Sequence, residues 1–366
     1  MKRMKTSNMN YIGSKKSLLD FIYSSINKIV DEDCTTFCDL FAGTGIVGRY
    51  FKNKGYRIIA NDIQYYSYVL NMHYIGNSGH FPFKKLCSLL PELKELHDIF
   101  KYNYVCEYLS NLDGVKGFIY NNYCPGGTSS EEYIRKYFTD YNGMKCDAIR
   151  LKIEEWFTQN NISKSEYFLL LATLLENIDK LANTASVYGA YLKKFKNSAL
   201  KPLLMKPIDI IHSEYDNLVF NSDINDLIKS ISGDILYLDP PYNHRQYATN
   251  YHILETISKN DDPQIKGVSG MRDYQYQKSL YCSKQHALES FDKLISEANM
   301  KFIFLSYNNE GIMSLEDIEK IMSKRGEYGV FSMDYNRFKA DKTENRNHKA
   351  NKTIEYLHYV RISDNK

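Results

Sequence analysis

The segment Asp239-Pro240-Pro241-Tyr242 has the residue types of a chemical site, and it directly follows the apolar run from Ile235 to Leu238. Two consecutive prolines fix φ and supply no N–H group, so the turn is rigid and offers only carbonyl acceptors. The Asp239 carboxylate and the Pro240 carbonyl can accept the two hydrogens of an exocyclic amine. Tyr242 can stack on the ring that carries this amine. The segment therefore predicts a site that grips an amino group, and the alternative is a strand that ends in a rigid turn.

A second candidate site is the glycine-rich segment from Asp39 to Gly48, which contains Gly43-Thr-Gly45. Glycines between a strand and a helix let the backbone approach a ligand closely and direct helix N–H groups toward it. Asp62 follows at the end of the next apolar run, where a carboxylate can accept hydrogen bonds from both hydroxyls of a ribose. The spacing also fits a nicotinamide dinucleotide site or a purely structural turn. Asp39 favours a different ligand, because an acid beside the turn would repel a pyrophosphate but suits the ammonium of a methionine moiety.

Both candidate sites need a sheet that presents the ends of its strands at one edge. Short apolar runs alternate with helical segments, and this pattern implies a mainly parallel sheet with right-handed crossovers. Gly55 ends a helix predicted over residues 46–53. Strands are predicted at residues 36–40, 56–62, 217–221, 234–238, 301–306 and 353–362.

Residues 77–215 differ from the flanking regions and are predicted to form a largely helical insertion. Ser163 and Glu166 form a capping box, and apolar residues follow it at helical spacing. The segment 180–206 contains six lysines and no acidic residue. We expect residues 1–76 and 216–366 to form one domain and residues 77–215 to form a second lobe.

Composition sets the broad class of the protein. The chain of 366 residues is 43% hydrophobic and 25% charged, which is typical of soluble globular proteins and excludes collagenous and wholly disordered classes. The apolar stretch from Tyr167 to Leu175 is far shorter than the roughly 20 residues of a membrane helix. Seven scattered cysteines lack metal-ligand spacing, and no signal peptide is recognisable. We therefore expect a cytoplasmic protein with reduced thiols, no metal and no membrane contact.

The two sites together resemble the Dam-like, alpha-type family of adenine-specific DNA N6-methyltransferases of restriction–modification systems. Asn10-Tyr11-Ile12-Gly13-Ser14-Lys15 is similar to the N-terminal motif of that family, with Tyr11 in place of the usual Trp. Phe220-Asn221-Ser222-Asp223 resembles the motif that precedes the catalytic strand, and Asp239 to Tyr242 matches the catalytic motif unmodified. The resemblance implies catalytic roles for Asp239, Pro240, Pro241 and Tyr242. It implies cofactor-binding roles for Tyr11, Lys15, Asp39, Phe41, Ala42, Gly43, Thr44, Gly45, Asp62, Ile63, Asp223, Ile224 and Asp239.

The resemblance implies an α/β, Rossmann-like fold and S-adenosyl-L-methionine as cofactor, with S-adenosyl-L-homocysteine as product. The methyl group would pass to N6 of an adenine that is flipped out of the duplex at a specific site. Residues 1–76 and 216–366 would be the catalytic methyltransferase domain, and residues 77–215 the target-recognition region.

Double-stranded DNA is the partner that this resemblance implies. Basic runs are solvated surfaces about as often as they bind phosphate, but a DNA enzyme favours phosphate contacts. The predicted DNA-binding residues are Lys193, Lys194, Lys196, His244, Arg245 and Arg272, and further basic residues lie at 337–352. We expect a bacterial or phage protein, a monomer or weak dimer, that associates with the nucleoid through DNA. A restriction–modification role would pair it with a cognate restriction endonuclease.

The same residues are compatible with several other functions. A cytosine-N4 DNA methyltransferase uses the same amine chemistry but more often carries Ser in place of Asp239. An RNA adenine-N6 methyltransferase can share the catalytic motif, although it seldom needs a large recognition insertion. A nicotinamide-dependent oxidoreductase would explain the glycine turn but leave the catalytic motif without a role. An inactive DNA-binding module is disfavoured because no expected catalytic residue is missing.

Overall fold

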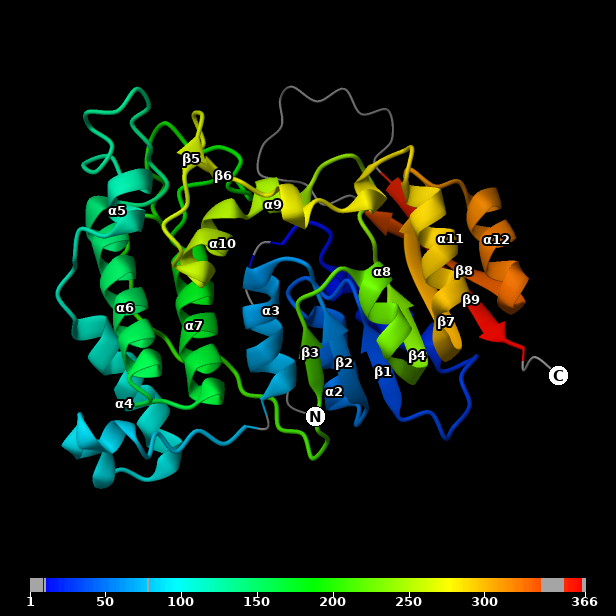
Figure 1. Ribbon diagram of the computed structural model, residues 1–366, viewed down its shortest axis with the longest axis horizontal. Coiled ribbons are helices and arrows are strands. Elements are labelled where there is room, and N and C mark those ends of the chain that lie inside the picture. The colour runs from blue at the N-terminus through cyan, green and yellow to red at the C-terminus, as the bar shows by residue number, and fades with distance from the viewer. Residues whose placement is uncertain (1–8, 10, 78, 337–351, 364–366) are drawn as a thin grey trace. The chain divides into compact units, whose positions relative to one another are not determined.

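The computed structural model describes residues 9, 11–77, 79–336 and 352–363. Figure 1 shows the chain coloured from blue at the N-terminus to red at the C-terminus. The chain divides into two compact units. Unit 1 comprises residues 1–12, 72–212 and 249–274, and unit 2 comprises residues 13–71, 213–248 and 275–366. The long segment of unit 1, residues 72–212, overlaps the range 77–215 that is predicted as an insertion. Residues 249–274, which the sequence prediction assigns to the catalytic domain, cluster with unit 1 instead.

Unit 2 is built on a seven-stranded sheet with the order β3-β2-β1-β4-β7-β9-β8. All pairs are parallel except those made by β9, which runs antiparallel between β7 and β8. The order of the first five strands is that of a Rossmann-like doubly wound sheet. This topology confirms the predicted α/β fold. The strands are β1 (Thr36–Asp39), β2 (Arg57–Asn61), β3 (Leu218–Phe220), β4 (Ser232–Leu238), β7 (Asn299–Asn308), β8 (Gly326–Asn336) and β9 (Lys352–Ile362).

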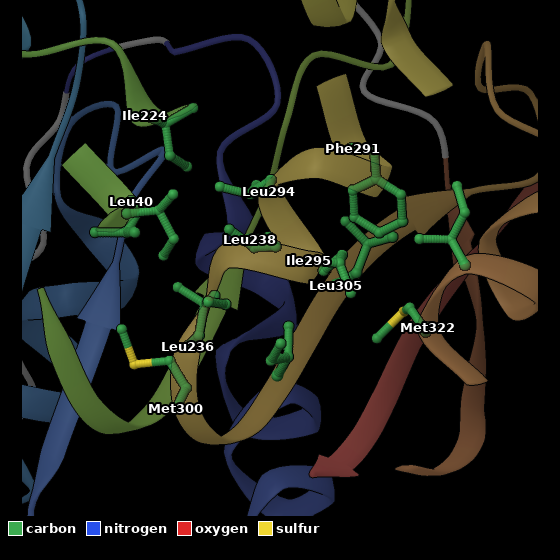
Figure 2. Close-up of a cluster of buried hydrophobic side chains, with 14 of the residues drawn as sticks. Leu40, Ile224, Leu236, Leu238, Phe291, Leu294, Ile295, Met300, Leu305 and Met322 are labelled. Atoms are coloured by element: carbon green, nitrogen blue, oxygen red, sulfur yellow. The ribbon is translucent and has the colours of Figure 1, made fainter. Parts of the chain in front are cut away.

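Helices cover both faces of this sheet. On one face, Phe51 of α2 stacks on Phe37 of β1 with ring centroids 3.8 Å apart. On the other face, Phe291 and Leu294 of α11 pack with Leu236 of β4, as Figure 2 shows. The helices of unit 2 are α1 (Leu19–Ile26), α2 (Ile46–Asn53), α3 (Tyr65–Asn71), α8 (Ile224–Leu227), α11 (Ala287–Glu297) and α12 (Leu315–Met322), with 3₁₀ turns at Lys15–Leu18, Ile228–Ser230, Gln275–Gln277, Leu280–Cys282 and Ser323–Arg325. The helix α9 (Tyr247–Asn250) lies where the chain passes from unit 2 to unit 1.

An apolar cluster of unit 2 lies under α11 and α12. Ile303 lies in the middle of β7, is fully buried and belongs to this cluster. We expect Ile303→Ala to lower the free energy of unfolding by roughly 2–5 kcal/mol, because it removes buried methyl groups and leaves a cavity. Urea denaturation followed by circular dichroism measures this loss.

The control for this prediction is Val330→Ala. Val330 lies on β8 and is 48% exposed, so truncation should change the free energy of unfolding by only about 0.5 kcal/mol. Equal losses in the two variants would show that the cluster under α11 does not dominate the stability of unit 2.

Unit 1 is largely helical. The predicted capping box is present: Ser163 Oγ accepts from the Glu166 N–H, and the Glu166 carboxylate accepts from the Ser163 N–H. The buried Arg150 guanidinium of α6 donates to the carbonyls at the C-terminal end of α10, at 2.8 Å from Ile257 O. The elements of unit 1 are α4 (Asp98–Asn111), α5 (Phe118–Tyr123), α6 (Asp140–Thr158), α7 (Lys164–Asp179), α10 (His252–Lys259), the antiparallel pair β5 (Ile265–Lys266) and β6 (Met271–Arg272), a π-helical turn at Met72–Gly76, and 3₁₀ turns at Leu86–Ser88 and Pro91–Lys94.

Neither unit offers a membrane span in its described part. Among the residues with assigned structure, every helix is too short or too polar to cross a bilayer. The most apolar long helix is α7, and its 16 residues include Glu166 and Glu176.

Candidate active site

The Asp239-Pro240-Pro241-Tyr242 segment forms the turn at the carboxyl end of β4, near the middle of the sheet of unit 2. The Tyr242 hydroxyl donates a hydrogen bond of 2.8 Å to Asp239 Oδ1. The Asp239 side chain remains 19% exposed, and within the described residues its Oδ2 accepts no hydrogen bond. The turn therefore leaves a second carboxylate oxygen available as an acceptor beside the Pro240 carbonyl.

Lys15 brings a buried positive charge to this turn from near the start of the chain. Its ammonium lies 3.2 Å from Asp239 Oδ1, donates to the Tyr242 hydroxyl and lies 4.6 Å from the centre of the Tyr242 ring. Burial raises the pKa of Asp239, although Lys15 and the Tyr242 hydroxyl act in the opposite direction. Burial also holds the pKa of Tyr242 well above its usual value, so its hydroxyl stays protonated and can donate.

The glycine turn after β1 is held by two carboxylates. Gly43 and Gly45 have φ angles of +52° and +74°, which glycine adopts without steric cost. The Gly43 N–H donates to Asp62 Oδ2 at 2.8 Å, and the Gly48 N–H donates to Asp39 Oδ2 at 3.0 Å. Asp39 is 1% exposed, and burial raises its pKa to about 8. Two carboxylates thus lie against the backbone of the glycine turn, and such groups can accept hydrogen bonds from a cationic or hydroxylated ligand.

Two further predicted residues follow the neighbouring strands. Asp62 follows β2 and Asp223 follows β3, and the Asn221 side chain links the two loops by donating to the Asp62 carbonyl at 2.7 Å. Asp223 Oδ1 accepts from the Asn225 N–H at 2.8 Å and so caps α8. Ile224 is 6% exposed and packs in the apolar cluster. The loop after β3 therefore presents a carboxylate next to an apolar side chain.

These loops meet because the carboxyl ends of parallel strands lie at one edge of a sheet. The strands β1 to β4 are adjacent and parallel, so the residues that follow them are brought together. At this edge unit 2 holds the Asp239–Tyr242 turn together with Lys15, Asp39, Phe41, Ala42, Gly43, Thr44, Gly45, Asp62, Ile63, Asp223 and Ile224.

Tyr11, the remaining predicted cofactor-binding residue, belongs to unit 1. Its ring stacks on Tyr251 with centroids 4.8 Å apart, and the neighbouring Ile12 N–H donates to the Tyr251 hydroxyl at 2.8 Å. Asn10 of the same motif lies outside the described residues.

His244 and Arg245 follow the Asp239–Tyr242 turn and are exposed. A ring nitrogen of His244 lies 3.1 Å from the Cys282 carbonyl, and Gln246 exchanges two hydrogen bonds with the backbone of Ser279. These bonds hold the loop against the segment 279–282 and leave the Arg245 side chain at the surface.

The basic residues predicted in unit 1 differ in exposure. Lys193 and Lys194 are exposed, whereas the Lys196 ammonium donates to the Thr184 carbonyl at 2.9 Å. The structure does not favour a DNA contact for Arg272, because its side chain is 4% exposed and its guanidinium pairs with both carboxylate oxygens of Asp261. The C-terminal basic residues 337–351 lie outside the described residues.

Two residues near the Asp239–Tyr242 turn are absent from the predicted site residues. Glu355 of β9 has Oε1 3.8 Å from the Lys15 ammonium, and Ser306 of β7 has Oγ 3.4 Å from the Tyr242 hydroxyl. The only sequence signal for Glu355 is an acidic residue inside the apolar run of the last predicted strand. Ser306 has no signal, because serine at a strand end is common.

The cysteines do not gather with histidines or acids. All seven are free thiols, and six of them are buried. Within the described ranges, no group of three or more His, Cys, Asp or Glu side chains is arranged to hold a metal ion.

Comparison with known proteins is consistent with this geometry. Residues 11–321 match the family described as D12 class N6 adenine-specific DNA methyltransferase. The chain is 49% identical to the Type II methyltransferase M.NlaIII of Neisseria lactamica over 354 residues, which cover 96% of this chain and 99% of that protein. It is 36% identical to the Type II methyltransferase M.CviAII of Paramecium bursaria Chlorella virus 1, over 97% of this chain and 98% of that protein. It is 38% identical to the Type II methyltransferase M.FokI of Planomicrobium okeanokoites, over 96% of this chain but only 52% of that protein. The chain belongs to the D12 class of N6 adenine-specific DNA methyltransferases.

Proposed function

We propose that this DNA adenine methyltransferase uses S-adenosyl-L-methionine to methylate N6 of a flipped-out adenine within a specific double-stranded sequence. The observation that carries the proposal is the rigid turn of Asp239 and Tyr242, ion-paired to Lys15, at the same sheet edge as the glycine turn. A nicotinamide-dependent oxidoreductase would need no such amine-binding turn.

The turn suits the chemistry of an adenine amine. The N6 lone pair is delocalised into the ring, so the free amine is a poor nucleophile. Asp239 Oδ2 and the Pro240 carbonyl would accept its two hydrogens, return electron density to nitrogen and stabilise the positive charge that develops there. Tyr242 would stack on the extruded base, which offsets part of the few kcal/mol lost on unstacking. The methylated nitrogen then loses a proton to the solvent or to Asp239.

The residues around the glycine turn fit S-adenosyl-L-methionine. Asp39 would accept from its ammonium and Asp62 from its ribose hydroxyls, while Asp223 would accept from its adenine amine with Ile224 against the ring. These residues match the cofactor groups in chemical type. The buried Asp39 and the Asp62 carboxylate at the Gly43 N–H are acceptors, and Ile224 beside Asp223 offers an apolar surface for the adenine ring. When bound, the cofactor supplies an electrophilic methyl group, and no metal is needed for its transfer.

The raised pKa of Asp39 leads to a pH-dependent affinity for this cofactor. With a pKa of about 8, Asp39 is mostly protonated at neutral pH in the free protein and must ionise to bind an ammonium. Affinity should therefore rise with pH, by up to about tenfold between pH 6 and pH 7, with release of close to one proton. Isothermal titration in buffers of different ionisation enthalpy measures both quantities.

Asp39→Asn is the matched variant for this measurement, because asparagine keeps an acceptor for the Gly48 N–H but cannot ionise. It should bind the cofactor more weakly and with the same affinity at pH 6 and pH 7. If the wild-type affinity does not change between these pH values, Asp39 does not bind the ammonium.

DNA recognition is proposed to use both units. Lys193 and Lys194 of unit 1 and Arg245 with His244 of unit 2 are exposed and would contact phosphates, which position the duplex without reading its sequence. The helical unit 1 would supply the base contacts that select the target sequence. We expect a monomer or weak dimer.

A restriction–modification role, with a cognate endonuclease for the same sequence, is supported by the Type II relatives. The activity is tested with labelled S-adenosyl-L-methionine and DNA from a host that lacks the modification. Nucleoside analysis should find N6-methyladenine, and sequencing that detects modified bases should find it at one motif. N4-methylcytosine, or methylation of RNA in preference to DNA, would overturn the proposal.

A further inference from the structure

Glu355 is a buried carboxylate beside the catalytic turn that the reaction described above does not use. It lies on β9, is 5% exposed, and its Oε1 is 3.8 Å from the Lys15 ammonium. Its Oε2 is buried and has no hydrogen-bond partner in the described part of the chain. Burial of a carboxylate oxygen without a hydrogen-bond partner costs free energy of folding.

The charges around Lys15 do not balance. The ammonium faces two carboxylates, Asp239 at 3.2 Å and Glu355 at 3.8 Å, and its third contact is the neutral Tyr242 hydroxyl. Without Glu355, Lys15 would cancel the charge of Asp239, and the group would be neutral. With Glu355 ionised, the group carries one net negative charge.

On the basis of the proposed function, we infer that Glu355 is a positioning residue for methyl transfer, which shares the Lys15 ammonium with Asp239 and thereby keeps Asp239 a strong acceptor. A carboxylate whose charge is fully paired with a buried ammonium is a weaker hydrogen-bond acceptor for the N–H groups of a substrate amine. Because the Lys15 ammonium interacts with two carboxylates, Asp239 remains a strong hydrogen-bond acceptor. The group also keeps a net negative charge close to the amine, where positive charge develops during transfer. Lys15 still holds the Tyr242 hydroxyl, so the geometry of the turn is kept.

A pH profile separates this role from a structural one. Activity should rise with pH as Asp239 ionises, and removal of a neighbouring negative charge favours ionisation. The acid limb of the profile should therefore move to lower pH when Glu355 is neutralised. The charged and titratable groups that face Asp239 and Glu355 are Lys15, Asp39, Tyr237, Tyr242 and Tyr247.

The test compares Glu355→Gln, Glu355→Asp and Glu327→Gln with wild type in a DNA methylation assay. Glu355→Gln keeps the volume and one acceptor for Lys15, so cofactor affinity and the DNA KM should stay within about threefold. Its kcat should fall about tenfold, and the acid limb should move down by about half a pH unit or more. Glu355→Asp keeps the charge, so the acid limb of its pH–activity profile should lie at the wild-type pH and most of kcat should be retained. Glu327 is an exposed residue of the adjacent strand β8, and Glu327→Gln should match wild type.

The possible failures are distinguishable. If wild type makes no N6-methyladenine, the proposed function fails. If wild type is active and Glu355→Gln has the same kcat and the same acid limb of the pH–activity profile, the proposed positioning role of Glu355 is wrong. The same conclusion follows if Glu355→Gln changes only KM. If Glu355→Gln does not fold, the pH–activity profile of Glu355→Asp is the test. An acid limb at the wild-type pH supports the inference, and an acid limb at lower pH overturns it.

Discussion

Asp239→Ala should reduce methyl transfer by roughly a thousandfold or more, while cofactor binding stays nearly intact. Asp239 is the charged acceptor of the Asp239–Tyr242 turn, which we propose to be catalytic, and removal of one preorganised group that stabilises developing charge costs roughly 10²–10³-fold in kcat. After the substitution, Glu355 is the remaining carboxylate partner of Lys15, and the net negative charge of the group is lost. Single-turnover methylation with saturating DNA and cofactor measures the loss.

Two further variants make this prediction specific. Asp239→Asn keeps the size of the side chain but removes its charge, and it should be nearly as inactive as the alanine variant. Asp292→Asn alters a surface ion pair of α11 with Lys324 and should keep wild-type activity. An Asp239→Ala enzyme that transfers methyl groups at more than a tenth of the wild-type rate would contradict the acceptor role, as would one that has lost cofactor binding but retains transfer.

Tyr242→Ala should lower kcat by roughly a hundredfold, the second largest effect that we expect. Stacking of a base on an aromatic side chain is worth about 1–3 kcal/mol, and the ring also carries the hydroxyl that donates to Asp239 Oδ1. Tyr242→Phe retains the ring and loses only the hydroxyl, so its kcat should fall by only about tenfold.

A fluorescent base analogue at the target position separates the two contributions. 2-Aminopurine fluorescence should increase when the wild-type and Tyr242→Phe enzymes extrude the base, and the increase should be much smaller for Tyr242→Ala. If the phenylalanine variant is as slow as the alanine variant, the hydroxyl rather than the ring dominates, and the stacking role is wrong.

The strands with strong apolar runs could be predicted from the sequence. The helix predicted over residues 46–53 is α2 (Ile46–Asn53), and the strand predicted at 36–40 is β1 (Thr36–Asp39). Both elements bury side chains on the sheet, so tertiary packing and local pattern agree. The edge strand β8 (Gly326–Asn336) is missing from the prediction, because an edge strand with two glycines and exposed residues such as Val330 lacks an apolar pattern.

The site could be predicted where it lies in contiguous motifs and not where it depends on tertiary contact. Asp239 and Tyr242 are three residues apart, and a turn is enough to join them. Glu355 reaches Lys15 only because β9 inserts antiparallel beside β7, a pairing that no local pattern encodes. Arg272 also depends on tertiary contact: an arginine in a polar loop suggests a surface contact, and only the fold reveals its pairing with Asp261.

The central claim is that Asp239 and the Pro240 carbonyl grip the amino group of an extruded adenine. A crystal structure of the enzyme with a non-reactive cofactor analogue and DNA that contains the target sequence measures this directly. The adenine N6 should lie about 3 Å from both Asp239 Oδ2 and Pro240 O, with the Tyr242 ring parallel to the base and the sulfur of the analogue facing N6. An adenine that remains stacked in the duplex, or an extruded base whose N6 contacts neither acceptor, would contradict the claim.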